Sequence, residues 1–307
     1  MTLTPMTQPR PRMIPIGKTG EAGEMAVLDM GDARRAVDLI FVHANGFNAQ
    51  TYVSILAPLA KDFRILAIDQ RGHGRSTLIA NPQARRSWGD MRDDLVALLD
   101  VLGAEPGARP VVLAGHSMGG TVSLLASRLR PDRVKGLVMF DPVIMPWAVS
   151  LMANLPWADH KVWKAAPIAQ GALRRKSVFD DRASVVAAYK GRGAFKTWPE
   201  EVLADYVAGG FKDRADGKLE LACSPAWEAS NFTAMANDPW TAAARASCPV
   251  QVFRAEIAST CRIGEASAFC RRNRRGLISV TEVAGTTHFL PMERPALVRQ
   301  ALAEAMA

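Results

Sequence analysis

The chain has 307 residues, of which 49% are hydrophobic and 22% charged, and a formal net charge of +8 at pH 7. These values are typical of one large globular domain, or of one domain that carries an insertion. The apolar runs fall short of the roughly 18 residues that a transmembrane helix needs. The proline-containing amino terminus lacks the apolar core of a secretory signal, so residues 1–24 are interpreted as a flexible lead-in to a cytoplasmic protein.

Cysteine spacing and charge distribution each exclude a class of partner. No C-x-x-C pair and no histidine at metal-ligand spacing occurs near the four cysteines, so reduced thiols and no metal site are predicted at Cys223, Cys248, Cys261 and Cys270. Much of the positive charge lies in short clusters, such as residues 271–275, without interleaved aromatic residues. Such clusters are usually solvated, so we expect no nucleic-acid partner.

Strands alternate with helices along the first half of the chain. Strands are predicted at residues 25–30, 37–42, 63–68, 110–114 and 134–140, and helices at residues 52–60, 90–102 and 121–129. The pattern resumes later with strands at residues 249–254 and 277–283 and a closing helix at residues 295–306. This alternation predicts a parallel sheet with right-handed crossovers.

The strand at residues 110–114 runs directly into Gly-x-Ser-x-Gly, and a helix follows. This is the sequence of a nucleophile elbow, a tight strand-to-helix turn that exposes the serine hydroxyl at the carboxyl edge of the sheet. Gly115 and Gly119 are required because side chains there would collide with neighbouring backbone. We therefore predict that Ser117 is a catalytic nucleophile, with free N–H groups of the helix start beside it.

The alternation of strands and helices lapses between residues 143 and 246. This stretch is helix-prone and contains six of the seven tryptophans, which are Trp147, Trp157, Trp163, Trp198, Trp227 and Trp240. No internal repeat or low-complexity tract occurs in the chain.

A serine nucleophile needs a base, and His288 is the histidine best placed to act as one. It follows the last predicted strand, on a loop at the same sheet edge as Ser117. The order of serine first and histidine last is that of the α/β-hydrolase triad. His43 and His73 are instead expected to hold neighbouring loops by hydrogen bonds.

Four motifs, in order, resemble those of the α/β-hydrolase superfamily from about residue 25 to residue 307. They are residues 43–47, 69–76, 115–120 and 285–289. The resemblance implies an α/β-hydrolase fold, with a mostly parallel sheet flanked by helices and a helical cap inserted after strand 6. The core would comprise residues 25–142 and 247–307 and the cap residues 143–246, and the family's chemistry implies no metal and no organic cofactor.

The same resemblance implies the donors of an oxyanion hole. They would be the backbone N–H groups of Asn45 and Met118. The usual His-Gly-x motif of the family reads His43-Ala44-Asn45 here, and Ala44 is a departure from it. The Asn45 side chain either adds a third donor or favours the turn before Gly46.

Two carboxylates compete for the role of the triad acid. Many relatives carry an Asp after the seventh strand, but that slot holds Ala258 here, with Glu256 two residues before it. Relatives of the haloalkane-dehalogenase type place the acid after the sixth strand, where this chain has Asp141. We predict Asp141 as the acid, although an Asp before Pro142 also suits a simple turn.

These residues together predict a serine hydrolase of carboxylesterase type, acting on an ester or lactone of a hydrophobic small molecule. The substrate pocket is expected beneath the cap, with Phe47, Trp147 and Phe289 in its lining. The alternatives are a hydrolase of C–C bonds in ring-cleavage products, or a hydrolase-fold receptor that binds without turnover. The sequence leaves open a homodimer.

Overall fold

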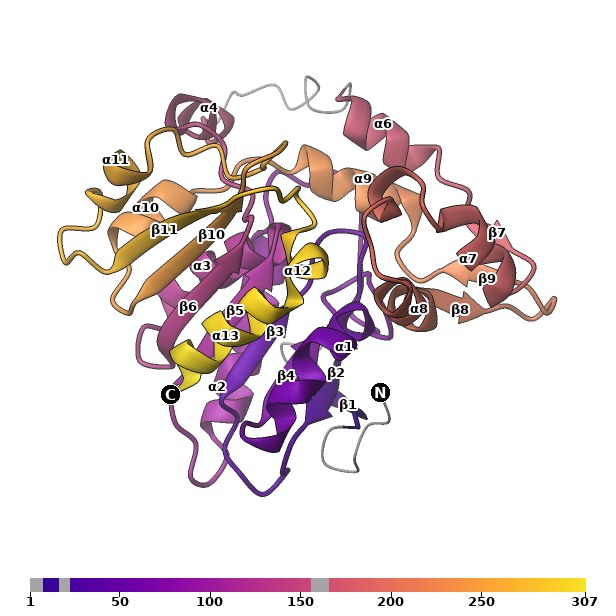
Figure 1. Cartoon of the computed structure of the whole chain (residues 1–307), viewed down its shortest axis with the longest axis horizontal. Helices are drawn as coiled ribbons and strands as arrows, with labels where there is room; N and C mark the ends of the chain where they lie inside the picture. Colours follow the sequence, from indigo (N-terminus) through magenta and orange to yellow (C-terminus); the bar gives the residue numbers. More distant parts are fainter. Residues whose placement is uncertain (1–7, 17–22, 156–165) are drawn as a thin grey trace.

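A computed structural model describes residues 8–16, 23–155 and 166–307. Its centre is an eight-stranded sheet in the order β1-β2-β4-β3-β5-β6-β10-β11 (Figure 1). The strands are β1 Arg10–Pro15, β2 Glu24–Met30, β3 Leu39–Val42, β4 Ile65–Ile68, β5 Val111–His116, β6 Val134–Phe140, β10 Val250–Ala255 and β11 Ile278–Val283. Among its described strands, only the β1–β2 and β2–β4 pairs are antiparallel, so the sheet is mostly parallel, as predicted.

Strand β1 corrects the prediction that residues 1–24 form a flexible lead-in. Its six residues pair antiparallel with β2, from Arg10 opposite Asp29 to Pro15 opposite Glu24. Arg10 and Arg12 both reach the buried carboxylate of Asp29. The prolines that suggested a flexible segment are tolerated because β1 is an edge strand, where missing N–H donors break no central ladder.

Helices cover both faces of the sheet. One face carries α2 Gly89–Gly103, α3 Met118–Leu129 and α10 Pro239–Ala244, and the other carries α1 Val53–Leu56, α12 Leu290–Glu293 and α13 Pro295–Met306 (Figure 1). The helix predicted at residues 52–60 is instead three short turns, namely 3-10 helix Ala49–Tyr52, α1 and 3-10 helix Ala57–Lys61. Pro58 explains the break, since proline cannot donate to the helical ladder.

The segment of residues 143–246, called the insertion here, is not wholly helical. It contains α4 Trp147–Ala153, α6 Pro167–Leu173, α7 Arg182–Tyr189, 3-10 helix Gly193–Phe195, α8 Glu200–Gly209, α9 Pro225–Thr233 and α10. It also contains a small antiparallel sheet of β7 Val178–Phe179, β9 Leu219–Leu221 and β8 Phe211–Asp213. The Asp-Gly dipeptide at residues 216–217 sits in the turn between β8 and β9, with a positive φ of 79° at Gly217.

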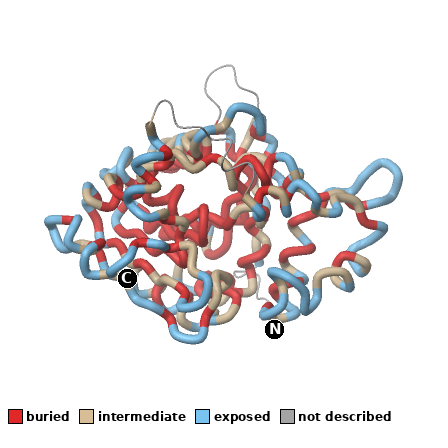
Figure 2. Tube along the Cα trace, turned by 90° about the horizontal axis from the view of Figure 1, so that it is seen from above, coloured by how far each residue is buried: buried red, intermediate tan, exposed pale blue. Residues whose placement is uncertain are grey.

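Most of the insertion lies over the carboxyl edge of the large sheet, above and to its right in Figure 1. Helix α10 differs, because it packs beside α3 on the flank of the sheet. Helix α11 Ala266–Cys270 follows β10. Buried chain gathers at the centre of the molecule and exposed chain surrounds it (Figure 2).

The parallel register brings the residues of interest together. Strands β3, β5, β6, β10 and β11 all end at one edge, so the segments that follow Val42, His116, Phe140, Ala255 and Val283 meet there. Within the described residues, no helix is both long and apolar enough to cross a membrane.

Candidate active site

Ser117 lies at the tight turn between β5 and α3, in the conformation that the elbow motif predicts. Its φ of 55° and ψ of −122° are strained for a residue with a side chain. A Cβ on Gly119 would lie 2.2 Å from the Val42 carbonyl oxygen, and one on Gly115 would lie 2.5 Å from the Gly119 carbonyl carbon. Gly119 therefore allows the turn to fit against the end of β3, and Gly115 allows the start of α3 to return close over β5.

Asp141 and His288 are in direct contact although they are 147 residues apart. Nδ1 of His288 lies 2.6 Å from Oδ2 of Asp141, whose side chain is fully buried. A carboxylate only accepts hydrogen bonds, so the proton of the neutral imidazole is on Nδ1. The other ring nitrogen, Nε2, then has the free lone pair that a general base needs.

The loop after β10 provides the other partners of the Asp141 carboxylate. Its Oδ1 accepts from the Ala255 N–H at 2.9 Å and from the Ser259 hydroxyl, and its Oδ2 accepts from the Thr260 N–H at 3.0 Å. Burial alone would raise the pKa of Asp141, but the hydrogen bonds from His288, Ser259 and Ala255 hold this pKa below its usual range. Asp141 is therefore an anion held in one orientation.

Glu256, the competing carboxylate, lies elsewhere. It is exposed, and its Oε2 accepts a hydrogen bond from the Gly285 N–H at 2.7 Å. Its contact is with the start of the loop that carries His288, while the imidazole itself contacts Asp141.

The Asn45 side chain has a third role that neither sequence alternative included. Its Nδ2 donates to the Glu228 carbonyl at 3.0 Å, and its Oδ1 accepts from Asn231 Nδ2 at 2.8 Å. Both partners lie on α9, so the loop after β3 is tied to the insertion. Asn45 and Met118 share a cavity with Ser117, where their N–H groups have no acceptor among the described residues.

Buried histidines hold the loops around this site. His116 lies between the Tyr52 hydroxyl, 2.8 Å from its Nδ1, and the His288 carbonyl, to which its Nε2 donates at 2.7 Å. His43 Nε2 accepts from the Gln70 N–H, and His73 Nε2 accepts from the Gly46 N–H. Burial is the main cause that lowers the pKa of His116 to about 3 and that of His43 to about 4, so both are neutral.

A cavity of about 230 Å³ opens beside Ser117 and His288. Most of its lining is apolar and comes from both the core and the insertion, and polar residues complete it. The described lining residues are Asn45, Trp88, Ser117, Met118, Val143, Met145, Ala166, Ile168, Asn231, Phe232, Met235, Thr260, Arg262 and His288.

The three residues predicted for the pocket do not line this cavity. Phe47 and Phe289 stack on each other with centroids 6.4 Å apart, and both pack against Trp198 of the insertion. Trp147 is 48% exposed, and the Arg272 guanidinium lies over its ring. Aromatic residues near the motifs were expected to face the substrate, but Phe47 and Phe289 instead pack between the core and the insertion.

The other tryptophans of the insertion are also packing residues where the structure describes them. Trp198 and Trp227 are buried, and the Trp227 Nε1–H donates to the Arg71 carbonyl at 3.0 Å. Trp240 is buried against Phe269. Trp157 and Trp163 lie outside the described residues. Among the described lining residues of the cavity, the tryptophan is Trp88, which belongs to the core.

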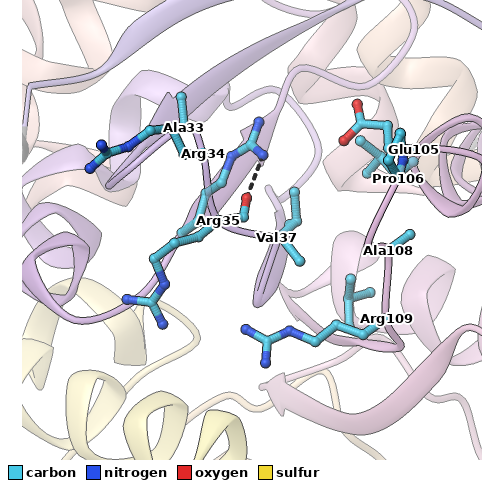
Figure 3. Close-up of a pocket in the computed structure, with 12 residues that line it drawn as sticks. Ala33, Arg34, Arg35, Val37, Glu105, Pro106, Ala108 and Arg109 are labelled. Carbon is cyan, nitrogen blue, oxygen red and sulfur yellow. Dashed lines mark hydrogen bonds between the residues drawn. The ribbon is translucent and has the colours of Figure 1, made fainter.

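A second cavity, of about 210 Å³, lies at the opposite edge of the sheet (Figure 3). Four arginines line it, and Arg64 Nη1 donates to the Arg35 carbonyl at 2.7 Å. Each arginine is paired with an aspartate, in the pairs Arg34–Asp32, Arg35–Asp38, Arg64–Asp29 and Arg109–Asp38. Each of the four arginines thus has a carboxylate partner within the fold, although Asp38 is shared by two of them, and the cavity is remote from Ser117.

A model of the alpha/beta hydrolase family matches residues 39–301 of the chain. The chain belongs to the alpha/beta hydrolase family. It is 25% identical over 265 residues to a 2-(acetamidomethylene)succinate hydrolase of Mesorhizobium japonicum, covering 86% of each chain. It is 30% identical over 105 residues to an (E)-2-((N-methylformamido)methylene)succinate hydrolase of Acinetobacter baylyi, or 34% of this chain and 37% of that one.

Solved structures agree with the fold of this alpha/beta hydrolase. An E-2-(acetamidomethylene)succinate hydrolase superposes with a TM-score of 0.72 at 23% identity, over 97% of this chain and 99% of that one. An esterase from Thermogutta terrifontis gives a TM-score of 0.64 at 23% identity, over 96% and 97% of the two chains. At these identities the likeness concerns the fold alone.

The sequence interpretation missed several residues of this hydrolase's site. Ser259 and Thr260 hold Asp141, Asn231 holds Asn45, and Arg262 lines the cavity. Their residue types are common, and none belongs to a motif. The one usable signal, for Ser259, Thr260 and Arg262, was their position after β10, where the family pattern drew attention only to Glu256 and Ala258.

Proposed function

We propose that this protein is a serine hydrolase that cleaves a carboxylic ester or lactone of a small molecule by way of an acyl-enzyme. The observation that carries the proposal is the 2.6 Å contact between His288 Nδ1 and the buried Asp141 carboxylate. His288 also lines the same cavity as Ser117, whose backbone is strained. A nucleophile, a base and a group that orients the base are the three parts that this chemistry needs.

In the proposed mechanism, Ser117 Oγ attacks the substrate carbonyl carbon while its proton passes to Nε2 of His288. Asp141 stabilises the imidazolium, and the N–H groups of Asn45 and Met118 stabilise the oxyanion. The tetrahedral intermediate collapses as His288 returns the proton to the departing alkoxide. Water then attacks the acyl-enzyme with His288 as base again, which releases the acid and restores the serine.

The cavity supports a small substrate with an apolar body. Met118, Val143, Met145, Ile168 and Met235 are among its apolar lining residues, and methionine side chains adapt to varied shapes. Its volume of about 230 Å³ is below the roughly 300–1,000 Å³ that is usual for ligand pockets, which favours a small substrate.

A second candidate function, hydrolysis of a C–C bond in a ring-cleavage product, is favoured by one observation. Arg262 lines the cavity, and a basic residue there suits an acid product. A panel of aryl esters, lactones and ring-fission acids separates the two reactions by their relative kcat/KM. A protein that bound these compounds without turning any of them over would be a receptor instead.

The proposed nucleophile is tested by Ser117→Ala. The substitution removes the covalent step, so kcat on a chromogenic short-chain ester should fall by about 10⁴-fold or more while the far-UV circular dichroism is retained. A fluorophosphonate probe should label the wild type and not this variant. Ser127→Ala, on the same helix, is the matched control and should be labelled. Labelling that persists in Ser117→Ala would overturn the proposal.

A further inference from the structure

The backbone of Arg262, which lines the cavity beside Ser117, is connected by a chain of hydrogen bonds to the Asp141–His288 pair. Its N–H donates to the Ile144 carbonyl at 2.8 Å, and the Ile144 N–H donates to the Thr260 carbonyl at 3.2 Å. The Thr260 N–H in turn donates to Asp141 at 3.0 Å. The backbone of Arg262 is therefore linked by hydrogen bonds to the segment that holds the Asp141 carboxylate.

Arg262 is the one side chain with a permanent charge among the described residues of the cavity lining. It is an exposed residue that lines the cavity, and it forms no ion pair within the part of the chain that the structure describes. Two other arginines near the oxyanion loop are committed elsewhere, since Arg85 pairs with Asp90 and Arg175 pairs with Glu228. The cavity thus combines apolar walls with a single cation that has no internal partner in the described chain.

We propose that Arg262 binds a carboxylate of the substrate, and that the natural substrate is a carboxylic acid whose hydrolysed group is a separate carbonyl. The planar guanidinium binds a carboxylate through two parallel hydrogen bonds, which fixes both the position and the orientation of the anion. The relatives that are named for substituted succinates act on compounds of this class. This inference rests on the proposed function, because it assigns the substrate class of the same site.

The charge of the substrate and the charge of residue 262 are varied together in the test. The two pairs of substrates are 4-acetoxybenzoate with its methyl ester and mono-4-nitrophenyl terephthalate with its methyl ester. The first pair places the carboxylate on the leaving group and the second places it on the acyl group. Within each pair the aromatic body and the scissile ester are the same, so the ratio of kcat/KM values reports the response to the carboxylate.

The wild type should favour the acid over its methyl ester in at least one pair, and Arg262→Met should lower this ratio by about 10- to 100-fold. Arg262→Lys should retain part of the preference, because the charge remains but the paired hydrogen bonds do not. Salt should reduce the wild-type ratio, since an exposed ion pair is screened. Arg271→Met removes an exposed charge nine residues further along the chain and should leave the ratio unchanged.

The experiment distinguishes failure of the inference about Arg262 from failure of the proposed function. If both esters of a pair are hydrolysed in a Ser117-dependent way but the ratio is the same in wild type and Arg262→Met, the inference is wrong and the proposed function stands. The inference is equally wrong if the Arg262 side chain only covers apolar surface with its stem, in which case both members of each pair lose activity together. If Ser117→Ala hydrolyses the esters like the wild type, the proposed function itself is wrong.

Discussion

At Asp141 the chain leaves β6 with a φ of 42°, a left-handed conformation that is uncommon for residues with side chains. This backbone accompanies a carboxylate whose partners all lie on other segments, namely the loop after β10 and the loop that carries His288. A turn-capping Asp would bond to the backbone just after itself. The partners of Asp141 therefore favour an orienting role over a local one.

The assignment of Asp141 as the triad acid leads to a ranking of two variants. Asp141→Asn should lower kcat by about 10⁴-fold, because an amide does not hold the Nδ1–H tautomer or stabilise the imidazolium. Glu256→Gln should stay within about tenfold of the wild type, since Glu256 contacts the Gly285 N–H and not the imidazole. Steady-state kinetics on one ester, with folding checked by circular dichroism, measure both. The reverse ranking would transfer the role to Glu256.

Strand β1 is held to the sheet by charge as well as by its ladder. The Asp29 carboxylate, on β2, is buried and contacts three guanidinium groups, from Arg10 at 3.0 Å, Arg12 at 2.8 Å and Arg64 at 2.9 Å. Of these, Arg64 is itself buried. These contacts hold the pKa of Asp29 below its usual range, although burial acts in the opposite direction.

Removing the charge of Asp29 should therefore destabilise the fold strongly. Asp29→Asn leaves the Arg64 guanidinium buried without an anion, and breaking such a pair costs about 3–5 kcal/mol in the free energy of unfolding. Urea unfolding followed by tryptophan fluorescence measures this cost. Asp32→Asn is the matched control, because Asp32 pairs with Arg34 at the surface and its loss should change little. Equal, small effects of the two substitutions would show that the cluster contributes nothing.

Among the described residues, three neutral histidines are buried near the carboxyl edge of the sheet, and this makes the stability of the whole molecule depend on pH. Burial is the main cause that lowers the pKa of His116 to about 3, that of His43 to about 4, and that of His73 well below its usual 6.5. The unfolded chain therefore binds protons below pH 6.5 that the folded chain does not. The stability from this source is complete above pH 6.5 and is lost as the pH falls toward the folded-state values.

His116→Asn removes one of these three proton-binding groups, so its contribution to the pH dependence of stability can be measured. Between about pH 6.5 and pH 4, the free energy of unfolding of the wild type should fall more steeply than that of the variant, by up to about 1.4 kcal/mol per pH unit. Urea titrations at several pH values measure the two slopes, and the comparison of slopes cancels the opposing contribution of Asp69, whose pKa burial raises to about 6. Equal slopes for the two proteins would mean that folding does not lower the pKa of His116.

The sequence alone determined the features of this hydrolase that local patterns specify. The elbow at Ser117 needs two glycines and a strand-to-helix change within a few residues, and each of these is visible in the chain. The alternation of strands and helices specified a mostly parallel sheet and hence the edge at which the loop of His288 meets the loop of Asp141. Both are consequences of short-range backbone geometry.

Only the tertiary structure decided what surrounds those residues. Whether Phe47 lines the cavity beside Ser117 or packs on Trp198, and whether Arg262 belongs to the lining of that cavity, depends on contacts between segments far apart in the chain. Strand β1 likewise depends on a distant contact. Its prolines suggested a flexible segment, but its arginines pair with Asp29 on β2 in the folded chain. Motifs are encoded locally, but a cavity wall is formed by side chains from several elements whose packing no single segment specifies.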